Sequence, residues 1–216
     1  MSNLMLDVLD KELERRGHRF VRYADDCNIY VRSIRAGERV MVGVSRFLEK
    51  KLKLKVNRAK SAVARPEERK FLGFTFTFNG EPKRRIAPQA LKRFKLRVRE
   101  LTRTGRHLAP AHLVNRLKLF LTGWRSYFGY CETPSVLRNL DSRVRHRLRM
   151  VFWRQWKRGR SRFAELRKRG VGRDLAAKTA GSALGPWRLS RSPALSIALP
   201  NSYFISLGLP NLAPRR

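Results

Sequence analysis

Two adjacent carboxylates between two short apolar runs constrain this chain more than any other feature. Asp25 and Asp26 lie in the middle of residues 20–31, which read FVRYADDCNIYV. Aromatic and β-branched residues dominate both runs, and apolar and polar residues alternate after the acids, as in a half-buried strand. The pattern predicts a β-hairpin with Asp25-Asp26 at its tip.

A simple turn is one interpretation of this Asp-Asp pair, and a metal site is the other. Two-residue hairpin loops usually hold Asn-Gly or Asp-Gly, because both positions favour positive φ angles. Two carboxylates about 5 Å apart also repel each other by about 3 kcal/mol at an effective dielectric constant of about 20. A divalent cation reverses that sign, since Mg²⁺ prefers carboxylate and phosphate oxygens. The spacing alone leaves both interpretations open.

The balance of charge is the second constraint. The chain of 216 residues holds 50 Lys and Arg against 16 Asp and Glu, a formal net charge of +34, and the excess is spread along its length. A compact fold with this charge repels itself unless a polyanion is bound, so nucleic acid is the expected partner. A structural RNA-binding protein would share this property, so charge alone does not indicate an enzyme.

The remaining composition excludes several classes of protein. A hydrophobic fraction of 42% argues against wholesale disorder. Two cysteines, Cys27 and Cys131, make neither a disulfide framework nor a zinc motif. No apolar run approaches the ~20 residues of a membrane span, and no secretory signal is visible. We therefore expect a cytoplasmic protein associated with nucleic acid.

The periodicity of apolar residues changes near residue 87. Before it, the pattern predicts helices, a strand over residues 52–56 and a β segment from residue 71; after it, only helices and loops. The fold class is therefore α+β, with domains over residues 1–87 and 88–216. In the first helix, Asp7, Asp10 and Glu14 share a face that we interpret as solvated. The predicted helices cover residues 3–16, 36–51, 111–130 and 160–169, and two others begin at Pro88 and at Thr133-Pro134, where Thr133 would cap.

Three short motifs resemble one known family over nearly the whole chain. Tyr23-Ala24-Asp25-Asp26 between two strands resembles the polymerase-site hairpin of reverse transcriptases. Residues 123–128 and 153–157, which read GWRSYF and WRQWK, resemble the thumb and the maturase-specific region of group II intron proteins. The chain thus resembles the reverse transcriptases/maturases encoded by group II introns. The resemblance implies a partial reverse transcriptase palm followed by an all-helical thumb and maturase domain with a C-terminal tail.

The resemblance also implies site residues and a cofactor. Proteins of this family copy RNA into DNA and bind their own intron RNA to help it splice. Asp25 would be a direct ligand in a two-metal Mg²⁺ site, with Asp26 supporting it. Tyr23, Ala24 and Lys60 would lie at the incoming nucleotide, and Leu72-Gly73 would form the primer grip. Lys60 is otherwise one lysine among many, and the glycine motif is too short to be specific alone.

The helices of the second half carry many cations and few acids, which favours contacts with phosphate over a merely solvated face. Trp153 and Trp156, three residues apart, are expected to pack inward, with base stacking as the alternative. The partner implied is group II intron RNA, together with template and primer in a full-length protein. The residues proposed for RNA binding are Arg97, Arg125, Arg138, Arg145, Arg149, Arg154 and Lys157.

Met1 is an abrupt beginning for such a protein. In the family, the fingers and the strand that carries a third metal-binding aspartate would precede it, so an incomplete polymerase site and an uncovered sheet face are expected. The first hypothesis is a C-terminal portion of a reverse transcriptase/maturase that serves splicing and mobility. The alternatives are a stand-alone RNA-binding splicing maturase without polymerase activity, and a non-functional remnant. The pattern does not indicate an oligomeric state.

Overall fold

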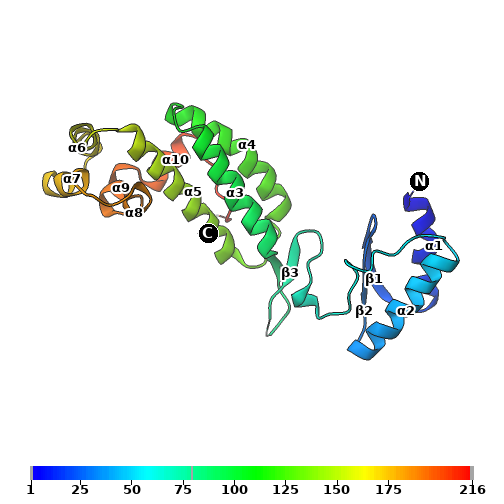
Figure 1. Cartoon of the computed structure of the whole chain (residues 1–216). Helices are drawn as coiled ribbons and strands as arrows, with labels where there is room; N and C mark the ends of the chain where they lie inside the picture. Colours follow the sequence, from blue (N-terminus) through cyan, green and yellow to red (C-terminus); the bar gives the residue numbers. More distant parts are fainter. Residues whose placement is uncertain (1, 79, 215–216) are drawn as a thin grey trace. The chain divides into compact units, whose positions relative to one another are not determined.

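The structure is a computed structural model and describes residues 2–78 and 80–214. The chain divides into two compact units, Met1–Pro82 and Lys83–Arg216, each with its own elements (Figure 1). Strands occur as far as Ile86, and every regular element described after it is a helix. The predicted α+β class is therefore confirmed.

The first unit is built around a β-hairpin. Strands β1 and β2 pair antiparallel, with Arg19 opposite Tyr30 and Tyr23 opposite Asp26. One helix precedes the hairpin and one follows it, and both lie beside it in Figure 1. The elements of this unit are α1 (Ser2–Arg15), β1 (Arg19–Tyr23), β2 (Asp26–Tyr30), α2 (Ile34–Lys50), a 3-10 turn (Pro66–Glu68) and β3 (Phe74–Phe76).

The hairpin is confirmed, but its predicted tip is wrong by one residue. The two loop residues are Ala24 and Asp25, and Asp26 already pairs with Tyr23. This register places Phe20 opposite Ile29, so their half-buried side chains share one face of the ribbon. A shift of one residue would turn one strand's apolar set to the other face, so burial of these side chains fixes the register and places the loop at Ala24-Asp25.

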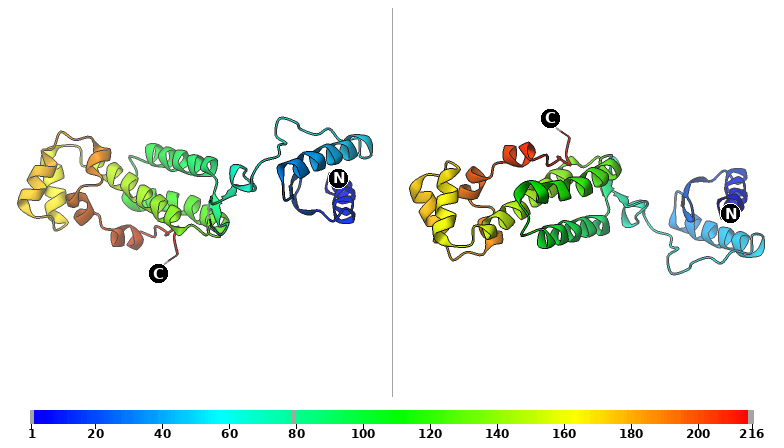
Figure 2. Two further views of the ribbon diagram at one scale, coloured as in Figure 1. Left: turned by 90° about the horizontal axis from the view of Figure 1, so that it is seen from below. Right: turned by 90° about the horizontal axis from the view of Figure 1, so that it is seen from above.

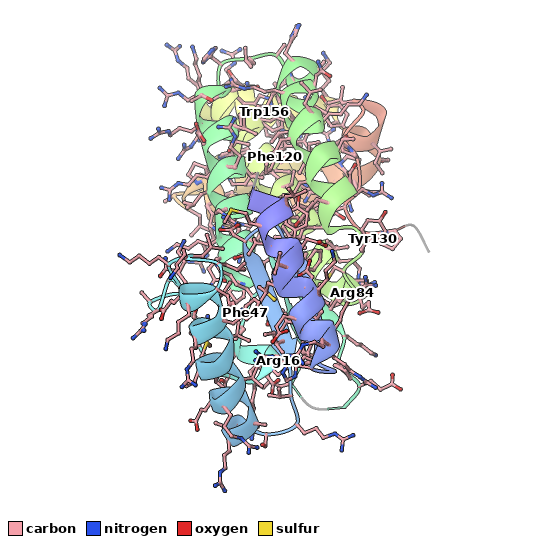
Figure 3. All side chains as sticks on the ribbon, turned by 90° about the vertical axis from the view of Figure 1, so that its right-hand side faces the viewer. Arg16, Phe47, Arg84, Phe120, Tyr130 and Trp156 are labelled. Atoms are coloured by element: carbon pink, nitrogen blue, oxygen red, sulfur yellow. The ribbon has the colours of Figure 1, made fainter. Side chains whose placement is uncertain are left out.

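Helix α1 contributes the small core of this unit. Leu9 and Leu13 are buried, whereas Leu4 is 83% exposed on the same helix. Figure 3 shows Arg16 close to Phe47 of α2, and the guanidinium carbon lies 5.9 Å from the centre of the phenyl ring. The two helices are therefore held partly by a cation–π contact, which stabilises exposed sites by about 0.5–1 kcal/mol.

The predicted strand over residues 52–56 is wrong. Leu52, Leu54 and Val56 are half-buried and the lysines between them are exposed, as the alternation indicates. The amide of Leu54, however, donates to the carbonyl of Leu48 at 2.9 Å, and the segment has no ladder partner within the described residues. Alternation specifies which side chains turn inward, but a strand also requires a neighbouring backbone with free donors and acceptors.

The second unit is helical after one short strand. Helices α3, α4 and α5 lie side by side, and the shorter helices α6 to α9 gather around the end of α5, as both views of Figure 2 show. The elements are β4 (Arg84–Ile86), α3 (Pro88–Thr104), α4 (Pro110–Phe128), α5 (Pro134–Gln155), α6 (Gly159–Lys168), α7 (Arg173–Ala180), α8 (Pro186–Leu189), α9 (Pro193–Ala198) and α10 (Asn201–Ser206).

Helix α5 forms the centre of this core. Val144, Leu148 and Trp153 are each at most 1% exposed, so the expectation that Trp153 packs inward is confirmed. Thr133 does occupy the position before α5, but its side chain accepts no capping bond from the helix. Its hydroxyl lies 3.0 Å from the sulfur of Cys131 instead, so the predicted capping by Thr133 is wrong.

His146 of α5 makes the stability of this unit depend on pH. Its Nδ1 lies 3.1 Å from the carbonyl oxygen of Ser190, and its ring meets the Trp187 ring edge-on, 6.3 Å between centres. Burial lowers the pKa of His146, the hydrogen bond to Ser190 opposes this, and the charges of Arg149 and Arg191 lower the pKa further. The folded state therefore takes up a proton less readily than the unfolded chain.

We therefore expect the free energy of unfolding to fall as the pH decreases below about 6.5, the ordinary pKa of histidine. Urea unfolding of the full chain at a series of pH values between 7.5 and 5.5 would measure it. The His146→Asn variant should show a smaller decrease across this range than the unaltered chain, whereas His107→Asn, an exposed site, should not differ from it. Equal pH dependence in the chain and the His146→Asn variant would contradict the assignment.

Candidate functional site

Arg22 holds the tip of the β1–β2 hairpin against helix α1. Its Nη1 donates to the carbonyl oxygen of Ala24 at 2.9 Å, and its Nε donates to both carboxylate oxygens of Asp10, at 2.8 and 3.0 Å. The side chains of Arg22 and Asp10 are only 14% and 23% exposed, and the hydrogen bond to Asp10 raises the pKa of the guanidinium. The ion pair therefore fixes the loop that carries Asp25.

The interpretation of Asp10 as a solvated acid is wrong, because it is the partner of Arg22. Asp7, by contrast, remains 56% exposed and pairs with Lys11 on the same helix. The sequence carries a weak signal for the Arg22–Asp10 pair: an arginine on the inward side of a strand requires a buried acceptor. Only the packing of α1 on the hairpin identifies which of the helix acids provides it.

The loop residue Ala24 has a strained backbone. Its φ angle is +53°, a left-handed conformation that costs an L-residue about 1–2 kcal/mol. Arg22 compensates for this by holding the Ala24 carbonyl. A positive φ is also what a two-residue hairpin loop requires, so the turn that joins β1 to β2 accounts for this conformation.

Replacing Ala24 by glycine should stabilise the hairpin. Glycine removes the left-handed penalty, and its larger conformational entropy in the unfolded chain offsets about half of that gain. We expect Ala24→Gly to raise the free energy of unfolding by about 0.5–1 kcal/mol, measured by urea denaturation of the full chain. Ala64→Gly, an exposed position without positive φ, is the matched control and should not be stabilising. A loss of stability in Ala24→Gly would show that the left-handed backbone carries no strain.

Tyr23, Asp25 and Asp26 lie exposed at the end of the hairpin. Tyr23 is 64% exposed and, because it pairs with Asp26, the two side chains share the open face of the ribbon. Cys27 lies on the opposite face, across from Arg22. Burial raises the pKa of the Cys27 thiol to about 11, so this thiol stays protonated and unreactive at neutral pH.

Lys60 and the Leu72-Gly73 motif belong to separate turns of the same unit. Lys60 is exposed; its amide donates to the backbone of Asn57 at 3.1 Å, and its carbonyl accepts from Arg69 at 2.7 Å. These backbone hydrogen bonds fix the turn that contains Lys60, whereas its side chain is exposed to solvent. The hairpin thus brings Tyr23, Ala24, Asp25 and Asp26 together, and Lys60 is positioned independently.

Leu72 and Gly73 form a tight two-residue turn. Phe71 and Phe74 exchange both of their backbone hydrogen bonds at 2.9 Å, and Leu72 and Gly73 have φ angles of +51° and +78°. Two successive positive φ angles are the requirement of a type I′ turn, which explains the glycine and leaves Leu72 strained. The motif proposed as a primer grip is therefore a rigid turn.

The carboxylates present do not by themselves make a closed magnesium site. Asp25 and Asp26 provide the oxygen ligands that Mg²⁺ prefers. Within residues 2–78 and 80–214, however, no cluster of three or more His, Cys, Asp or Glu side chains is placed to hold a metal ion. The residues described therefore do not fit a complete two-metal site.

In the second unit, five of the cations proposed for RNA binding are exposed. Arg97 is the one among them with an acidic partner, since its Nη1 donates to Glu100 at 2.7 Å. The others are not ion-paired in the described structure, so they are available to an external anion. The exposed set is Arg97, Arg125, Arg138, Arg154 and Lys157.

Arg145 and Arg149 hold the C-terminal segment instead of facing solvent. Arg149 is 7% exposed; its Nε donates to the carbonyl of Leu199 at 2.9 Å and its Nη2 to Asn201 at 3.2 Å. Burial, together with the charge of Arg145, lowers the pKa of Arg149. Arg145 donates to the side chain of Asn211. Both guanidinium groups therefore have a structural task that the sequence pattern does not reveal.

Comparison with known families finds two matches, one in each of the two units of the chain. The family described as reverse transcriptase (RNA-dependent DNA polymerase) matches residues 1–76. This defines the first unit as reverse transcriptase-like. The family described as group II intron, maturase-specific domain, matches residues 91–170, which extend from the first turn of α3 to just beyond the end of α6. The chain belongs to the group II intron reverse transcriptases/maturases. A comparison with curated proteins found no match.

The helices of the second unit are amphipathic and do not resemble membrane spans. Across the described parts of the chain, no helix combines the length and the apolar character needed to cross a bilayer.

Proposed function

We propose that this chain binds group II intron RNA and assists its splicing and mobility, with the second unit as the RNA-contacting part. The observation that supports this most is the charge of α5: its sole acid, Asp141, is buried, and every exposed charged residue of the helix is an arginine, namely Arg138, Arg143 and Arg154. Arginines at this density repel one another, and a phosphate backbone neutralises them.

The exposed cations suit phosphate recognition geometrically as well. Guanidinium groups donate two parallel hydrogen bonds to one phosphate, and such charge-assisted bonds are roughly twice as strong as neutral ones. Arg138 and Arg154 lie on α5, a helix of 22 residues. A surface of this length meets several phosphates of a folded RNA, which gives both affinity and orientation.

The test is discrimination between RNAs. The full chain should bind a structured group II intron RNA at least about tenfold more tightly than an unrelated folded RNA of equal length, at one salt concentration. The double variant Arg138→Gln/Arg154→Gln should weaken binding to the intron RNA, whereas Lys50→Gln/Lys51→Gln, with the same loss of charge in the first unit, should change it less. Equal affinity for both RNAs would refute the maturase function and leave only charge.

A second candidate is RNA-directed DNA synthesis, and the exposure of Tyr23 and Asp26 on one face of the hairpin favours it. In this proposal Asp25 and Asp26 are the Mg²⁺ ligands, Tyr23, Ala24 and Lys60 lie at the nucleotide, and Leu72-Gly73 contacts the primer. A third carboxylate from outside the described residues is required. We therefore expect no extension of a DNA primer on an RNA template by this chain. Synthesis that Asp25→Asn abolishes would overturn this expectation and establish the polymerase.

A further inference from the structure

A groove between helices α3 and α5 carries four cations and an apolar wall. Its volume is about 290 Å³, and its lining includes Leu91, Leu96, Lys92, Lys95, Arg99 and Arg143. We refer to it as the α3–α5 groove. The α3 residues follow one another at helical spacing, so they form a single stripe along that helix. Neither the sequence motifs nor the family matches assign a ligand to this stripe.

The cations of the groove lack acidic partners. Arg97, the neighbouring arginine on α3, is paired with Glu100. In the described part of the chain, none of the four groove cations makes an ion pair with a carboxylate. Uncompensated like charges around one groove favour an anion at that place.

Two further arginine contacts fix this arrangement. The guanidinium carbon of Arg143 lies 5.6 Å from the centre of the Trp187 ring. Arg147 crosses from α5 to α3: its Nε and Nη2 donate to the hydroxyl of Thr102 at 3.1 and 2.8 Å, and Nη2 also donates to the carbonyl of Arg99 at 3.2 Å. A half-buried cation therefore stands beside the groove and ties together the two helices that line it.

The charge of Arg147 adds to the positive potential. Burial lowers the pKa of this guanidinium, and the charges of Arg99 and Arg143 lower it further. Arg99 and Arg143, which line the groove, therefore each repel the charge of Arg147. An anion in the α3–α5 groove would relieve that repulsion.

The size and the lining of the groove select the ligand. About 290 Å³ lies near the lower limit of small-molecule pockets, ~300 Å³, so it admits one nucleotide-sized group and excludes a duplex. Leu96 is 53% exposed, so an apolar surface is available beside the cations. Phosphate alone would leave Leu91 and Leu96 in water, whereas a nucleobase would cover them.

We propose that the α3–α5 groove binds one unpaired nucleotide of a folded RNA. Its base lies against Leu91 and Leu96, and the phosphates on either side of it contact Lys92, Lys95, Arg99 and Arg143. This inference rests on the proposed RNA-binding function, to which it adds a site and a preference for an extruded nucleotide over continuous duplex.

Two RNA hairpins, identical except for one bulged adenosine in the stem, provide the probe. Fluorescence anisotropy with the full chain at one salt concentration should show about tenfold tighter binding to the bulged hairpin. The exposed Leu96→Gln variant should reduce this preference to about twofold or less. Leu119→Gln, which alters an exposed leucine of α4 outside the groove (75% exposed, against 53% for Leu96), is the control and should retain it. Lys92→Gln/Lys95→Gln should weaken binding to both hairpins.

Equal affinity for the two hairpins would overturn the inference, as would equal effects of Leu96→Gln and Leu119→Gln. Competition by inorganic polyphosphate that removes the preference as well as the affinity would indicate a site for any anion and would also overturn it. Circular dichroism of each variant verifies that it is folded. A bulge preference without discrimination of intron RNA would refute the proposed function alone, and the reverse result would refute the groove alone.

Discussion

Raising the salt concentration from about 50 to about 200 mM should weaken binding of this chain to intron RNA by a factor of about 10³ to 10⁵. Such a loss is typical of a protein that neutralises six to ten phosphates, because each contact releases condensed counterions from the nucleic acid. The second unit presents a comparable number of cations: the exposed set and the four of the α3–α5 groove. Within residues 2–78 and 80–214, Arg97 is the one member of these two groups that forms an ion pair with a carboxylate.

The measurement is the slope of the logarithm of the association constant against the logarithm of the salt concentration. Arg138→Gln, which removes one exposed cation, should reduce the magnitude of this slope by about one. Arg35→Gln, an exposed position of the first unit, is the control and should leave the slope unchanged. A slope near zero would exclude phosphate contacts as the source of affinity.

Asp141→Ala should lower the free energy of unfolding of the full chain by about 2–4 kcal/mol. The carboxylate of Asp141 is 7% exposed and accepts the backbone N–H of Leu212 at 2.9 Å and that of Ala213 at 3.0 Å. Bonds to a charged acceptor contribute about 1.5–3 kcal/mol each, and buried donors without a partner cost about 1–3 kcal/mol. The variant would release the C-terminal segment from α5.

Urea unfolding measures the free energy of unfolding, and amide hydrogen exchange identifies the segment that is released. Exchange should accelerate at the amides of Leu212 and Ala213 and stay slow in the middle of α3. Asp174→Ala, which removes an exposed acid of α7, is the control and should change stability by less than about 0.5 kcal/mol. If Asp141→Ala does not fold, Asp141→Asn keeps one acceptor and should show the same local exchange. Unchanged exchange at both amides would contradict the proposed clamp.

The local patterns of the sequence predicted most of the secondary structure. The hairpin after the first helix, the prolines at the starts of α3 and α5, and the buried stripe of α5 all follow from near-neighbour preferences. Such preferences act within a few residues, so they survive in any tertiary context that buries the same face. The prediction of a strand over residues 52–56 was wrong because a strand forms only when it pairs with a second strand.

The sequence located the candidate site but did not predict its details. The motif at Tyr23–Asp26 located the hairpin, but its loop proved to be Ala24-Asp25. The sequence did not predict the contact between Arg22 and Asp10 that positions this loop. The two residues are twelve positions apart, and Asp10 resembled an ordinary surface acid. Charge identified the second unit as a polycation without separating the arginines that face solvent from those that hold the chain.

The sequence by itself determined the class of this protein: a paired-acid hairpin followed by strongly basic amphipathic helices predicts the family. Only the tertiary structure decided which cations are free. Arg145 and Arg149 are identical to Arg138 and Arg154 in residue type and helix, but they bind the segment from Leu199 to Asn211. The reason is physical. Helical periodicity specifies the side of α5 on which an arginine lies. The tertiary fold determines which segment, fifty or more residues later in the chain, packs against that side.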